Sequence, residues 1–288
     1  MKRPTKAIIT DAGFASRYLP ITKTIPKAML PFGNKPIMQL VVEECVEAGI
    51  REVIIVATPE GRPIYEDYFC NPVSHIHQQL KSQGKEDRYG LVREVMDLPK
   101  IIVIEQDQSL PYGNGSPIVS ARDYIADDEA FLVLYSDDVV FGKSDAKSLL
   151  EAYDRNPDAK AIVAAQEVDP SVVDKYGIFQ LKDDNKLDYI VEKPALGEEP
   201  SRLASYGRYL LTAEVFEHLN PDNTGLDSEL WTVDAITKLA KSGDVYVEAT
   251  EGRWVTTGDP KNYFLAHLQY VLDNEDYADD VRRAIQGE

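Results

Sequence analysis

The chain has 288 residues, of which 43% are hydrophobic and 28% are charged, as is usual for a globular protein that buries a substantial core. Its net charge of −18 argues against nucleic acid or an anionic membrane surface as a main partner. The sequence contains no apolar run of about 18 residues that could span a membrane, and its first residues lack the apolar core of a signal peptide. We therefore expect a cytoplasmic protein that binds neither nucleic acid nor membranes.

The first 35 residues differ in charge from the rest of the chain. They hold seven basic residues and one acid, a net charge of +6 within a chain of net charge −18. Residues 7–10 are predicted as a short apolar strand, and a loop of small residues follows it before Arg17, Lys23 and Lys27. Small residues let backbone N–H groups approach a phosphate, and fixed cations neutralise its charge. The segment therefore predicts an anion site, and our first hypothesis is a nucleoside triphosphate.

The next segments predict the start of a doubly wound α/β sheet. A helix is expected over residues 35–49, because apolar residues recur at helical spacing and a glycine ends the run. The β-branched residues 52–57 then predict a buried strand of the parallel type. Residues 62–97 are more polar and contain a predicted helix near residues 75–83. We expect this insertion to be a site of subunit contact, which is compatible with a homo-oligomer.

Two further buried strands are predicted over residues 100–105 and 131–135. Gln106 and the glycine-containing turn of residues 111–117 follow the first of them, and a helix is expected from that turn to Ile125. Asp137 and Asp138 follow the second strand. Ligands of open α/β sheets gather at the carboxyl ends of strands. One rim is therefore expected to be lined by residues 11–17, 106–115 and 137–138.

The second half of the chain mixes helices with short strands of antiparallel character. Its predicted helices cover residues 144–156, 212–219, 231–241 and 261–272. Its predicted strands cover residues 160–167, 176–179, 189–194, 204–211 and 245–248. The acidic tail after the last helix is expected to be frayed.

Together these elements predict one domain over residues 1–288 with an α/β fold. We expect a Rossmann-like doubly wound mixed sheet with helices on both faces and a smaller lobe beside it. Within this domain, residues 1–167 form the part with the anion-binding rim and residues 168–260 form the smaller lobe. Residues 261–288 form a C-terminal helix and tail.

The cysteines and the pair His75 and His77 do not indicate a redox or metal site. Cys45 and Cys70 lack a CxxC spacing, and Cys45 falls on the apolar side of a predicted helix, which favours a reduced thiol in the core. His75 and His77 have no further ligand-type residue at a suitable spacing, so a solvated helix face is the better interpretation.

Two common phosphate-binding motifs are absent from the sequence. A dinucleotide fingerprint needs three glycines after the first strand, and here Gly13 stands alone. Gly142-Lys143-Ser144 looks like the end of a P-loop, but Asp137 occupies the position of the leading glycine.

Several short motifs instead follow one another in a specific order along nearly the whole chain. They are Ala12-Gly13 with Arg17, Thr22, Pro26-Lys27, Met29-Leu30-Pro31, Lys35-Pro36, Asp137-Asp138, Tyr176-Gly177-Ile178, Val191 to Pro194, Gly207-Arg208-Tyr209, and Thr232 to Ile236. Each motif alone is weak, but the set resembles the nucleotidyltransferases that act on sugar 1-phosphates. Within that family the chain resembles the bacterial UTP–glucose-1-phosphate uridylyltransferases.

This resemblance implies a nucleotide site on the predicted rim. Ala12 and Gly13 are expected to hold the base, and their backbone N–H groups the phosphates. Gln106 is expected to read the edge of the base, because its amide both donates and accepts hydrogen bonds. The turn from Gly113 to Gly115 is expected beside it. The alternative for Gln106 is an ordinary surface side chain.

The resemblance also implies the catalytic residues and a cofactor. Arg17 and Lys27 are expected to neutralise charge on the α-phosphate and on the leaving pyrophosphate. Asp137 is expected to hold Mg²⁺, with Asp138 or Asp259 as a second ligand. The alternatives are an exposed loop lysine at position 27 and two solvated turn acids at positions 137 and 138.

A third group is implied for the sugar phosphate, in the smaller lobe on the sugar side. Lys193 is expected to bind the phosphate, and Glu192 to accept hydrogen bonds from sugar hydroxyl groups. Gly177 is expected to allow a close backbone approach. The alternative for Glu192 and Lys193 is a surface ion pair before a turn proline.

The sequence departs from the family pattern at three places. Ala15 replaces a glycine of the opening loop, and it can still donate its N–H if its φ angle stays negative. Ala28 stands where the family often has a glutamate that is thought to contact the base. Thr256 stands where a second metal carboxylate is expected.

The predicted function is transfer of a nucleoside monophosphate, UMP from UTP, to a sugar 1-phosphate, glucose 1-phosphate, with release of pyrophosphate and with Mg²⁺ as cofactor. The partners are therefore a nucleoside triphosphate and a sugar 1-phosphate. Two alternatives stay open. One is a degenerate relative that binds a nucleotide or nucleotide sugar without turnover, and the other is the same reaction with another base, such as that of dTTP or GTP.

Overall fold

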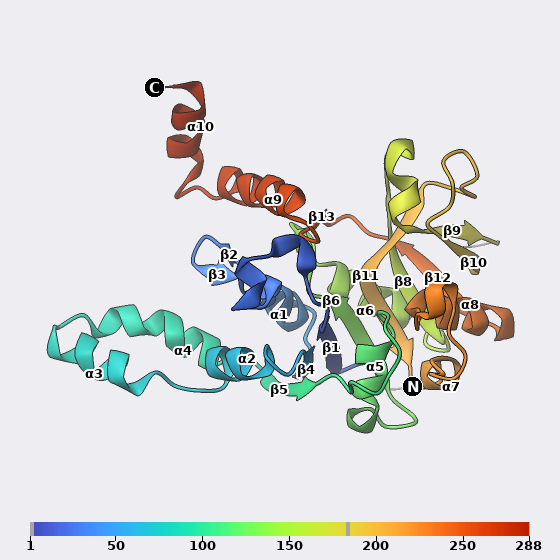
Figure 1. Cartoon of the computed structure of the whole chain (residues 1–288), viewed down its shortest axis with the longest axis horizontal. Helices are drawn as coiled ribbons and strands as arrows, with labels where there is room; N and C mark the ends of the chain where they lie inside the picture. The colour runs from blue at the N-terminus through green and yellow to red at the C-terminus, as the bar shows by residue number, and fades with distance from the viewer. Residues whose placement is uncertain (1–2, 183–184, 288) are drawn as a thin grey trace.

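The computed structural model describes residues 3–182 and 185–287 (Figure 1). One sheet of nine strands runs through it. These strands are β1 (Lys6–Asp11), β4 (Glu52–Ala57), β5 (Lys100–Glu105), β6 (Ala130–Tyr135), β8 (Ala161–Glu167), β9 (Gly177–Leu181), β10 (Leu187–Glu192), β11 (Leu203–Thr212) and β12 (Val245–Ala249). The main path through the sheet has the order β10-β9-β11-β6-β1-β4-β5, and β8 joins β11 to β12.

The sheet is parallel in one half and largely antiparallel in the other. β1 pairs in parallel with β4 and β6, and β4 pairs in parallel with β5. Strands covered on both faces are continuously apolar, and Val53 to Ala57 of β4 are all fully buried. β11 then pairs antiparallel with β6, β8 and β9. The predicted doubly wound mixed sheet is therefore confirmed.

Helices cover both faces of this sheet. They are α1 (Ile37–Glu47), α2 (Arg62–Phe69), α3 (Ser74–Ser82), α4 (Gly90–Met96), α5 (Ser116–Ser120), α6 (Asp145–Arg155), α7 (Val215–His218), α8 (Thr232–Ser242), α9 (Pro260–Asp273) and α10 (Ala278–Gln286). One core cluster contains Cys45 of α1 and Leu149 of α6, and the other contains Ile118 of α5 and Ile236 of α8. Cys45 has no exposed surface, as expected for a core thiol. None of the described helices is long and apolar enough to cross a membrane.

Four predicted helical boundaries or segments differ from the structure. Residues 35 and 36 form the short strand β3 (Lys35–Pro36), and α1 begins only after Pro36. α5 and α7 are shorter than expected; in the second case β11 continues to Thr212, which pairs with Ala130 of β6. The acidic tail is not frayed, because it forms α10. Ion pairs between residues three apart, Asp279 with Arg282 and Asp280 with Arg283, support this exposed helix.

A second, two-stranded sheet escaped sequence analysis. β7 (Asp138–Phe141) pairs antiparallel with β13 (Arg253–Thr256), and this places Thr256 opposite Asp138. α9 follows directly and packs on the opening segment. Its Tyr263 hydroxyl donates to the carbonyl of Pro31 at 2.7 Å, and its ring packs edge-on against Phe32 of β2 (Pro31–Phe32).

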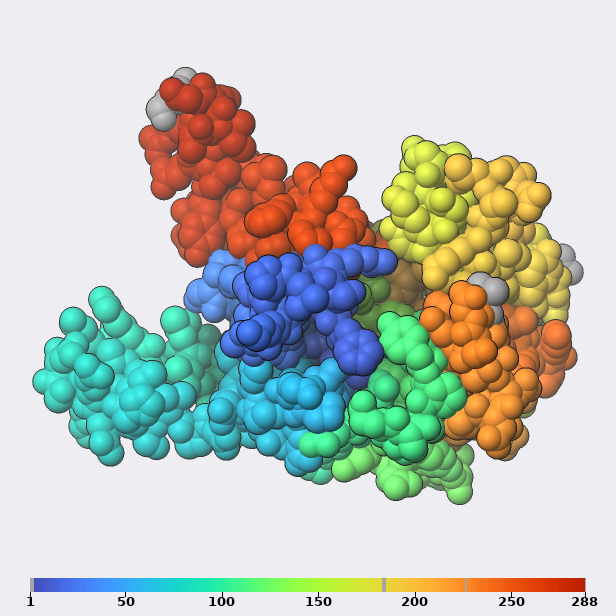
Figure 2. Space-filling model, in the orientation of Figure 1, coloured from blue at the N-terminus to red at the C-terminus, as the bar shows by residue number. Residues whose placement is uncertain are grey.

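The polar insertion of residues 62–97 forms an arm that projects from the left of the body in Figure 2, below the C-terminal helices and separated from them by a gap. α2 lies against β5, and its buried Tyr65 and Phe69 belong to the same core cluster as Val103 of β5. α3 buries none of its residues. Its His77 contacts Glu86 at 2.9 Å and stacks on Tyr89, which agrees with a helix surface rather than a metal site. A role of this arm in subunit contact stays a prediction.

A buried ion pair joins the elements behind the carboxyl ends of β1 and β6. Arg208 of β11 is fully buried and donates to Glu44 of α1 from Nε at 3.0 Å and from Nη2 at 2.8 Å. It also donates to the backbone carbonyls of Tyr135, at 3.2 Å, and Asp138, at 2.6 Å. Glu44 accepts in turn from the backbone N–H of Ala146 at the start of α6. Burial opposes the charge of Arg208, but Glu44 outweighs it and raises the pKa of the guanidinium.

The opening loop after β1 carries backbone strain at one position. Ala15 has φ 45° and ψ 41°, the left-handed conformation that L-residues other than glycine rarely adopt. The condition of a negative φ, under which Ala15 would keep its N–H available to a phosphate, is therefore not met.

We predict that Arg208→Met lowers the free energy of unfolding by about 3 to 5 kcal/mol, because it leaves the Glu44 carboxylate buried without its partner. The double variant Arg208→Met/Glu44→Leu should recover most of this loss. Urea unfolding curves measure both effects. A loss below about 1 kcal/mol in the single variant would contradict the importance of the ion pair.

We also predict that Ala15→Gly raises the free energy of unfolding by about 0.5 kcal/mol, because relief of the left-handed strain exceeds the extra freedom of an unfolded glycine. Ala12→Gly is the matched control: Ala12 does not have a positive φ, so the same change should be destabilising there. Thermal or urea unfolding measures the free energy of unfolding of both variants. If both variants lose the same free energy of unfolding, Ala15 is not strained.

Candidate active site

The predicted rim encloses a hollow of about 400 Å³ at the carboxyl ends of the parallel strands. The residues predicted for nucleotide and phosphate binding that line it are Ala12, Gly13, Arg17, Lys27, Gln106, Gly113 and Asp137. Tyr112, Asn114, Glu229 and Trp231 complete much of the wall. We call this space the nucleotide hollow. The structure thus brings together segments that lie more than a hundred residues apart in the chain.

A second hollow of about 190 Å³ adjoins the first, and we call it the sugar hollow. Gly177 and Glu192 line it, together with Tyr176, Asp138, Trp254 and Thr256. Asn114, Tyr135 and Asp137 line both hollows. A ligand in one hollow and a ligand in the other would therefore meet at Asp137.

Lys27 and Asp137 form an ion pair at the meeting point. Lys27 follows Pro26 in a short 3-10 helix, and its Nζ lies 2.5 Å from Oδ2 of Asp137. The Lys27 side chain is only 16% exposed, so it is not a freely solvated loop lysine. Burial alone would lower the pKa of Lys27, but the charges of Asp137 and Asp11 outweigh it and the pKa is raised. The same attraction outweighs burial at Asp137 and lowers the pKa of its carboxyl group.

Arg17 lies where the opening loop meets the turn of residues 256–259. It lines the nucleotide hollow, and its Nη1 is 3.5 Å from the carbonyl oxygen of Gly258. Next to it, the Tyr18 hydroxyl donates to the carbonyl of Thr257 at 2.6 Å. Thr257 in turn donates from its backbone N–H to the carbonyl of Asp137. These contacts fix the opening loop and the metal-binding candidate Asp137 to the same C-terminal turn.

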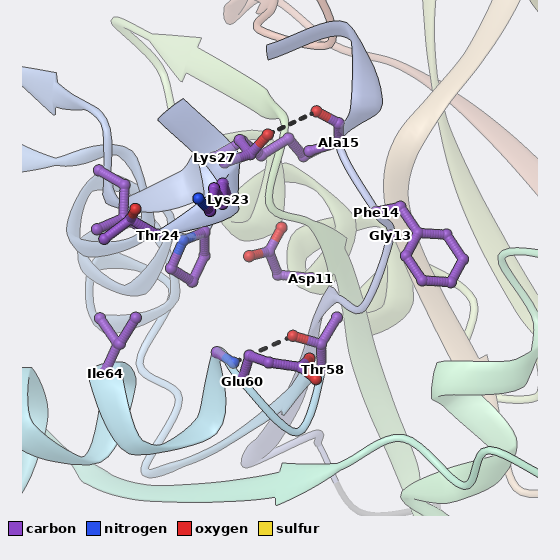
Figure 3. A pocket seen from close by; sticks show the side chains of 14 residues that line it. Asp11, Gly13, Phe14, Ala15, Lys23, Thr24, Lys27, Thr58, Glu60 and Ile64 are labelled. Carbon is purple, nitrogen blue, oxygen red and sulfur yellow. Dashed lines mark hydrogen bonds between the residues drawn. The ribbon is translucent and has the colours of Figure 1, made fainter. Parts of the chain in front are cut away.

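Asp11, at the end of β1, is a further acidic residue of the site that sequence analysis placed on the rim without a role. Its side chain is buried and accepts hydrogen bonds from the Tyr65 hydroxyl and, at 2.7 Å, from Ser136 Oγ. Burial raises the pKa of Asp11, and Lys27 partly offsets this. Figure 3 shows its carboxylate directed into a third, smaller hollow, which is lined by Asp11, Lys23, Lys27, Thr58 and Glu60 among others. The signal that could have found it is that Asp11 is the one acid in the basic opening segment.

The two candidates for a second metal ligand are already engaged. Asp138 accepts from Trp254 Nε1 at 2.6 Å and from the Gly207 N–H at 3.0 Å. Burial, and then the neighbouring Asp137, raise the pKa of Asp138 to about 6. Asp259 caps α9, with its two oxygens accepting from the backbone and the side chain of Asn262. This geometry does not favour either residue as a ligand.

The residues nevertheless fit Mg²⁺ in one binding mode. No group of three or more His, Cys, Asp or Glu side chains in residues 3–182 and 185–287 forms a metal cage. Mg²⁺ usually keeps several waters and takes one or two carboxylates together with substrate phosphates. Asp137 lines both hollows and therefore suits this mode. Thr256 Oγ1 and Asp137 Oδ2 both lie within 4 Å of the position of a Cβ added to Gly258, so position 256 faces the same point.

The glycines predicted for nucleotide binding divide into two groups. A Cβ added to Gly13 meets no atom within 4 Å, so this position leaves room for a ligand. Gly113 has φ 133°, and a Cβ there would lie 2.4 Å from the carbonyl oxygen of Leu230. Gly115 also packs on Leu230 and does not line the nucleotide hollow. Gly113 and Gly115 thus explain how the 106–116 loop is held against Leu230, which the sequence did not suggest.

The sugar hollow contains a carboxylate opposite a glycine. Glu192 pairs with Gly177 across β10 and β9, and a Cβ on Gly177 would lie 2.9 Å from Glu192 Oε2. Burial raises the pKa of Glu192, and Lys193 opposes this. Lys193 has φ 48°, and its Nζ lies 3.7 Å from Glu192 and 4.8 Å from the centre of the Trp231 ring. Glu192 thus lines the sugar hollow, whereas Lys193 is exposed, lines neither hollow and lies beside Trp231 of the nucleotide hollow.

Aromatic side chains at the mouth of the site were not predicted. Phe14 of the opening loop is 77% exposed and Tyr112 is 61% exposed. Their rings are nearly parallel, with centroids 6.5 Å apart. In Figure 3 the Phe14 ring points away from Asp11 and Thr58, toward the outside of the smallest hollow.

Comparisons with known proteins agree with this geometry. A model of the nucleotidyl transferase family matches residues 6–272. A UTP–glucose-1-phosphate uridylyltransferase of Staphylococcus saprophyticus is 36% identical over 286 residues, which cover 98% of this chain and 96% of that protein.

Solved structures agree as well. A UTP-bound UGPase from Acinetobacter baumannii has a TM-score of 0.86 and 28% identity, with 98% of this chain and 99% of that chain covered. A UDP-glucose pyrophosphorylase complexed with UDP-glucose has a TM-score of 0.79 and 30% identity, with 94% and 100% covered. The resemblance found in the sequence is confirmed, and this chain belongs to the nucleotidyl transferase family.

Proposed function

We propose that this protein transfers UMP from UTP to glucose 1-phosphate and releases pyrophosphate, with Mg²⁺ as its cofactor. The observation that carries the proposal is the pair of adjoining hollows that share Asp137, Tyr135 and Asn114. The larger hollow has the cations and small residues that suit a nucleoside triphosphate. The smaller one has a carboxylate and tyrosines that suit the hydroxyl groups of a sugar. Of the relatives named above, one is a UTP–glucose-1-phosphate uridylyltransferase, one is bound to UTP, and one is complexed with UDP-glucose, the nucleotide sugar that this reaction would form.

The reaction is an in-line displacement at phosphorus. A phosphate oxygen of the sugar 1-phosphate forms a bond to the α-phosphorus of UTP, and the bond from that phosphorus to the pyrophosphate oxygen breaks. The electron pair of the broken bond leaves with pyrophosphate. Enzymes accelerate such transfers mainly by positioning the reactants and by stabilising charge, so no nucleophilic side chain is required.

The residues where the two hollows adjoin would position the reactants and stabilise the charge. Lys27 and Arg17 line the nucleotide hollow and would neutralise charge on the α-phosphate and on the leaving pyrophosphate. Glu192 would orient the sugar by accepting from its hydroxyl groups, and Lys193 would meet its phosphate. Asp137 would hold Mg²⁺, which when bound neutralises phosphate charge and orients phosphate oxygens.

Selection of uracil would depend on Gln106 and the opening loop. Gln106 is half-buried on the wall of the nucleotide hollow, and its amide can both donate to and accept from a pyrimidine edge. Ala28 does not contribute directly, because its side chain is buried in the core beneath the loop. The choice of base therefore rests on fewer side chains than the family pattern suggests.

The first test is a pyrophosphate-release assay with glucose 1-phosphate and each of UTP, dTTP, GTP, CTP and ATP. We expect UTP to give the highest kcat/KM. A higher value with dTTP or GTP would establish the same reaction with another base. Silence with every nucleotide and several sugar phosphates, while calorimetry still detects nucleotide binding, would instead establish a non-catalytic relative.

We predict that Asp137→Ala lowers kcat at least a hundredfold, because it removes both the metal carboxylate and the partner of Lys27. Asp138→Asn is the matched control, since it keeps a polar side chain at the engaged neighbouring position. Steady-state kinetics at saturating Mg²⁺ measure both variants. A near-wild-type rate for Asp137→Ala would place the metal elsewhere.

Thr256→Asp should lower the Mg²⁺ concentration at half-maximal rate about tenfold, because a second carboxylate would face the same point as Asp137. Thr256→Asn, which adds an amide without a charge, serves as its control. An unchanged Mg²⁺ titration of Thr256→Asp would show that position 256 does not face the metal.

A further inference from the structure

Lys27 occupies an oxygen that a metal on Asp137 would compete for. Its Nζ is 2.5 Å from Asp137 Oδ2, closer than most charge-assisted hydrogen bonds. An ammonium group and a divalent cation repel each other, and both cannot sit against one carboxylate oxygen at such distances. Binding of a metal at Oδ2 of Asp137 therefore requires Lys27 to move away from that oxygen.

A second carboxylate lies within the surroundings of Lys27 and is built to accept it. Asp11 lines the nucleotide hollow and the smallest hollow, and Lys27 lines the same two. The Asp11 carboxylate is held in place by hydroxyl groups from two other elements, Tyr65 of α2 and Ser136 after β6. Both carboxylates attract the Lys27 ammonium group, Asp137 more strongly than Asp11. Lysine has a flexible four-carbon stem and three rotatable donors, so it can exchange one partner for the other.

A buried carboxylate beside a triphosphate site otherwise has an unfavourable effect. It would repel the phosphates of the substrate and would itself be desolvated, and such groups persist in proteins when they are paired. The hydroxyl groups of Tyr65 and Ser136 satisfy hydrogen bonds of Asp11 but bring no positive charge. Lys27 is the cation whose attraction acts on Asp11 most strongly.

We propose that Asp11 is a positioning residue that receives the Lys27 ammonium when Mg²⁺ and the nucleotide occupy Asp137. Lys27 stays buried and charged throughout, and the exchange aims it at the phosphates of the nucleotide hollow. Loading of the metal and orientation of the catalytic lysine are thereby coupled. The inference rests on the proposed function only in placing the metal at Asp137.

The test measures how strongly Mg²⁺ assists UTP binding, in calorimetric titrations without sugar phosphate and hence without turnover. The readout is the ratio of the UTP Kd without Mg²⁺ to the Kd at saturating Mg²⁺. In Asp11→Asn we expect this ratio to fall about tenfold, the effect of one charge-assisted hydrogen bond. In a Lys27→Met background, Asp11→Asn should change the ratio little, because Asp11 acts through Lys27.

Tyr65→Phe is the control for a purely structural role, since it removes a hydrogen bond to Asp11 but leaves its charge. If Tyr65→Phe lowers the ratio as much as Asp11→Asn does, the effect of Asp11 is structural and the proposal is overturned. An equal effect of Asp11→Asn with and without Lys27 would also overturn it, because Asp11 would then bind the metal directly.

The same titrations separate this inference from the proposed function. If Asp137→Ala leaves the ratio unchanged, the metal does not bind at Asp137, and both the metal assignment and the exchange of Lys27 are wrong. If the ratio depends on Asp137 but not on Asp11, the metal assignment stands and the role of Asp11 alone is refuted.

Discussion

The buried ion pair of Arg208 and Glu44 is the constraint on which the site depends. Two charges removed from water are costly unless each finds several partners, and here the partners belong to α1, α6, β6, β7 and β11. The guanidinium holds the carbonyls of Tyr135 and Asp138 on either side of Asp137, so it fixes the backbone that presents that carboxylate. The buried guanidinium of Arg208 thereby determines the position of the Asp137 carboxylate in the site. An apolar core could pack the same helices, but it would not grip the chain at these carbonyls.

The site itself is a balance of opposite charges in a small volume. The opening segment brings cations into an acidic protein, and Asp11, Asp137 and Asp138 stand at the ends of adjacent strands to meet them. Their environments differ, and so do their protonation preferences. Lys27 keeps the pKa of Asp137 low, whereas burial raises the pKa of Asp11 and of Asp138. Asp137, the carboxylate that faces both hollows, is therefore the one most firmly held in its charged form.

The parts of this structure that are governed by local pattern could be predicted from the sequence. The β-branched runs at 52–57 and 100–105 and the strand ends at Asp11, Gln106 and Asp137 followed from periodicity and from the rule on strand ends. The parts that depend on distant partners could not. The short strand β7 has no periodicity of its own and exists because β13 pairs with it, and Gly113 is required by the backbone of Leu230. Asp11 was placed on the rim but was given no role, because its contacts are with Tyr65 and Ser136 and its attraction is to Lys27, none of which adjoins it in sequence.

The pairing of β7 with β13 affects the order in which the chain can fold during its synthesis. Residues 138–141 can pair only after residues 253–256 have been made. The contacts of the opening loop likewise require the turn at Thr257 and Gly258. Contacts of such sequence separation form late, since the loop between them must close first. The parallel strands can assemble while the ribosome is still translating the smaller lobe. A nascent chain therefore carries most residues of the nucleotide hollow before the site is complete, and the site is complete only once residues 253–258 have been made.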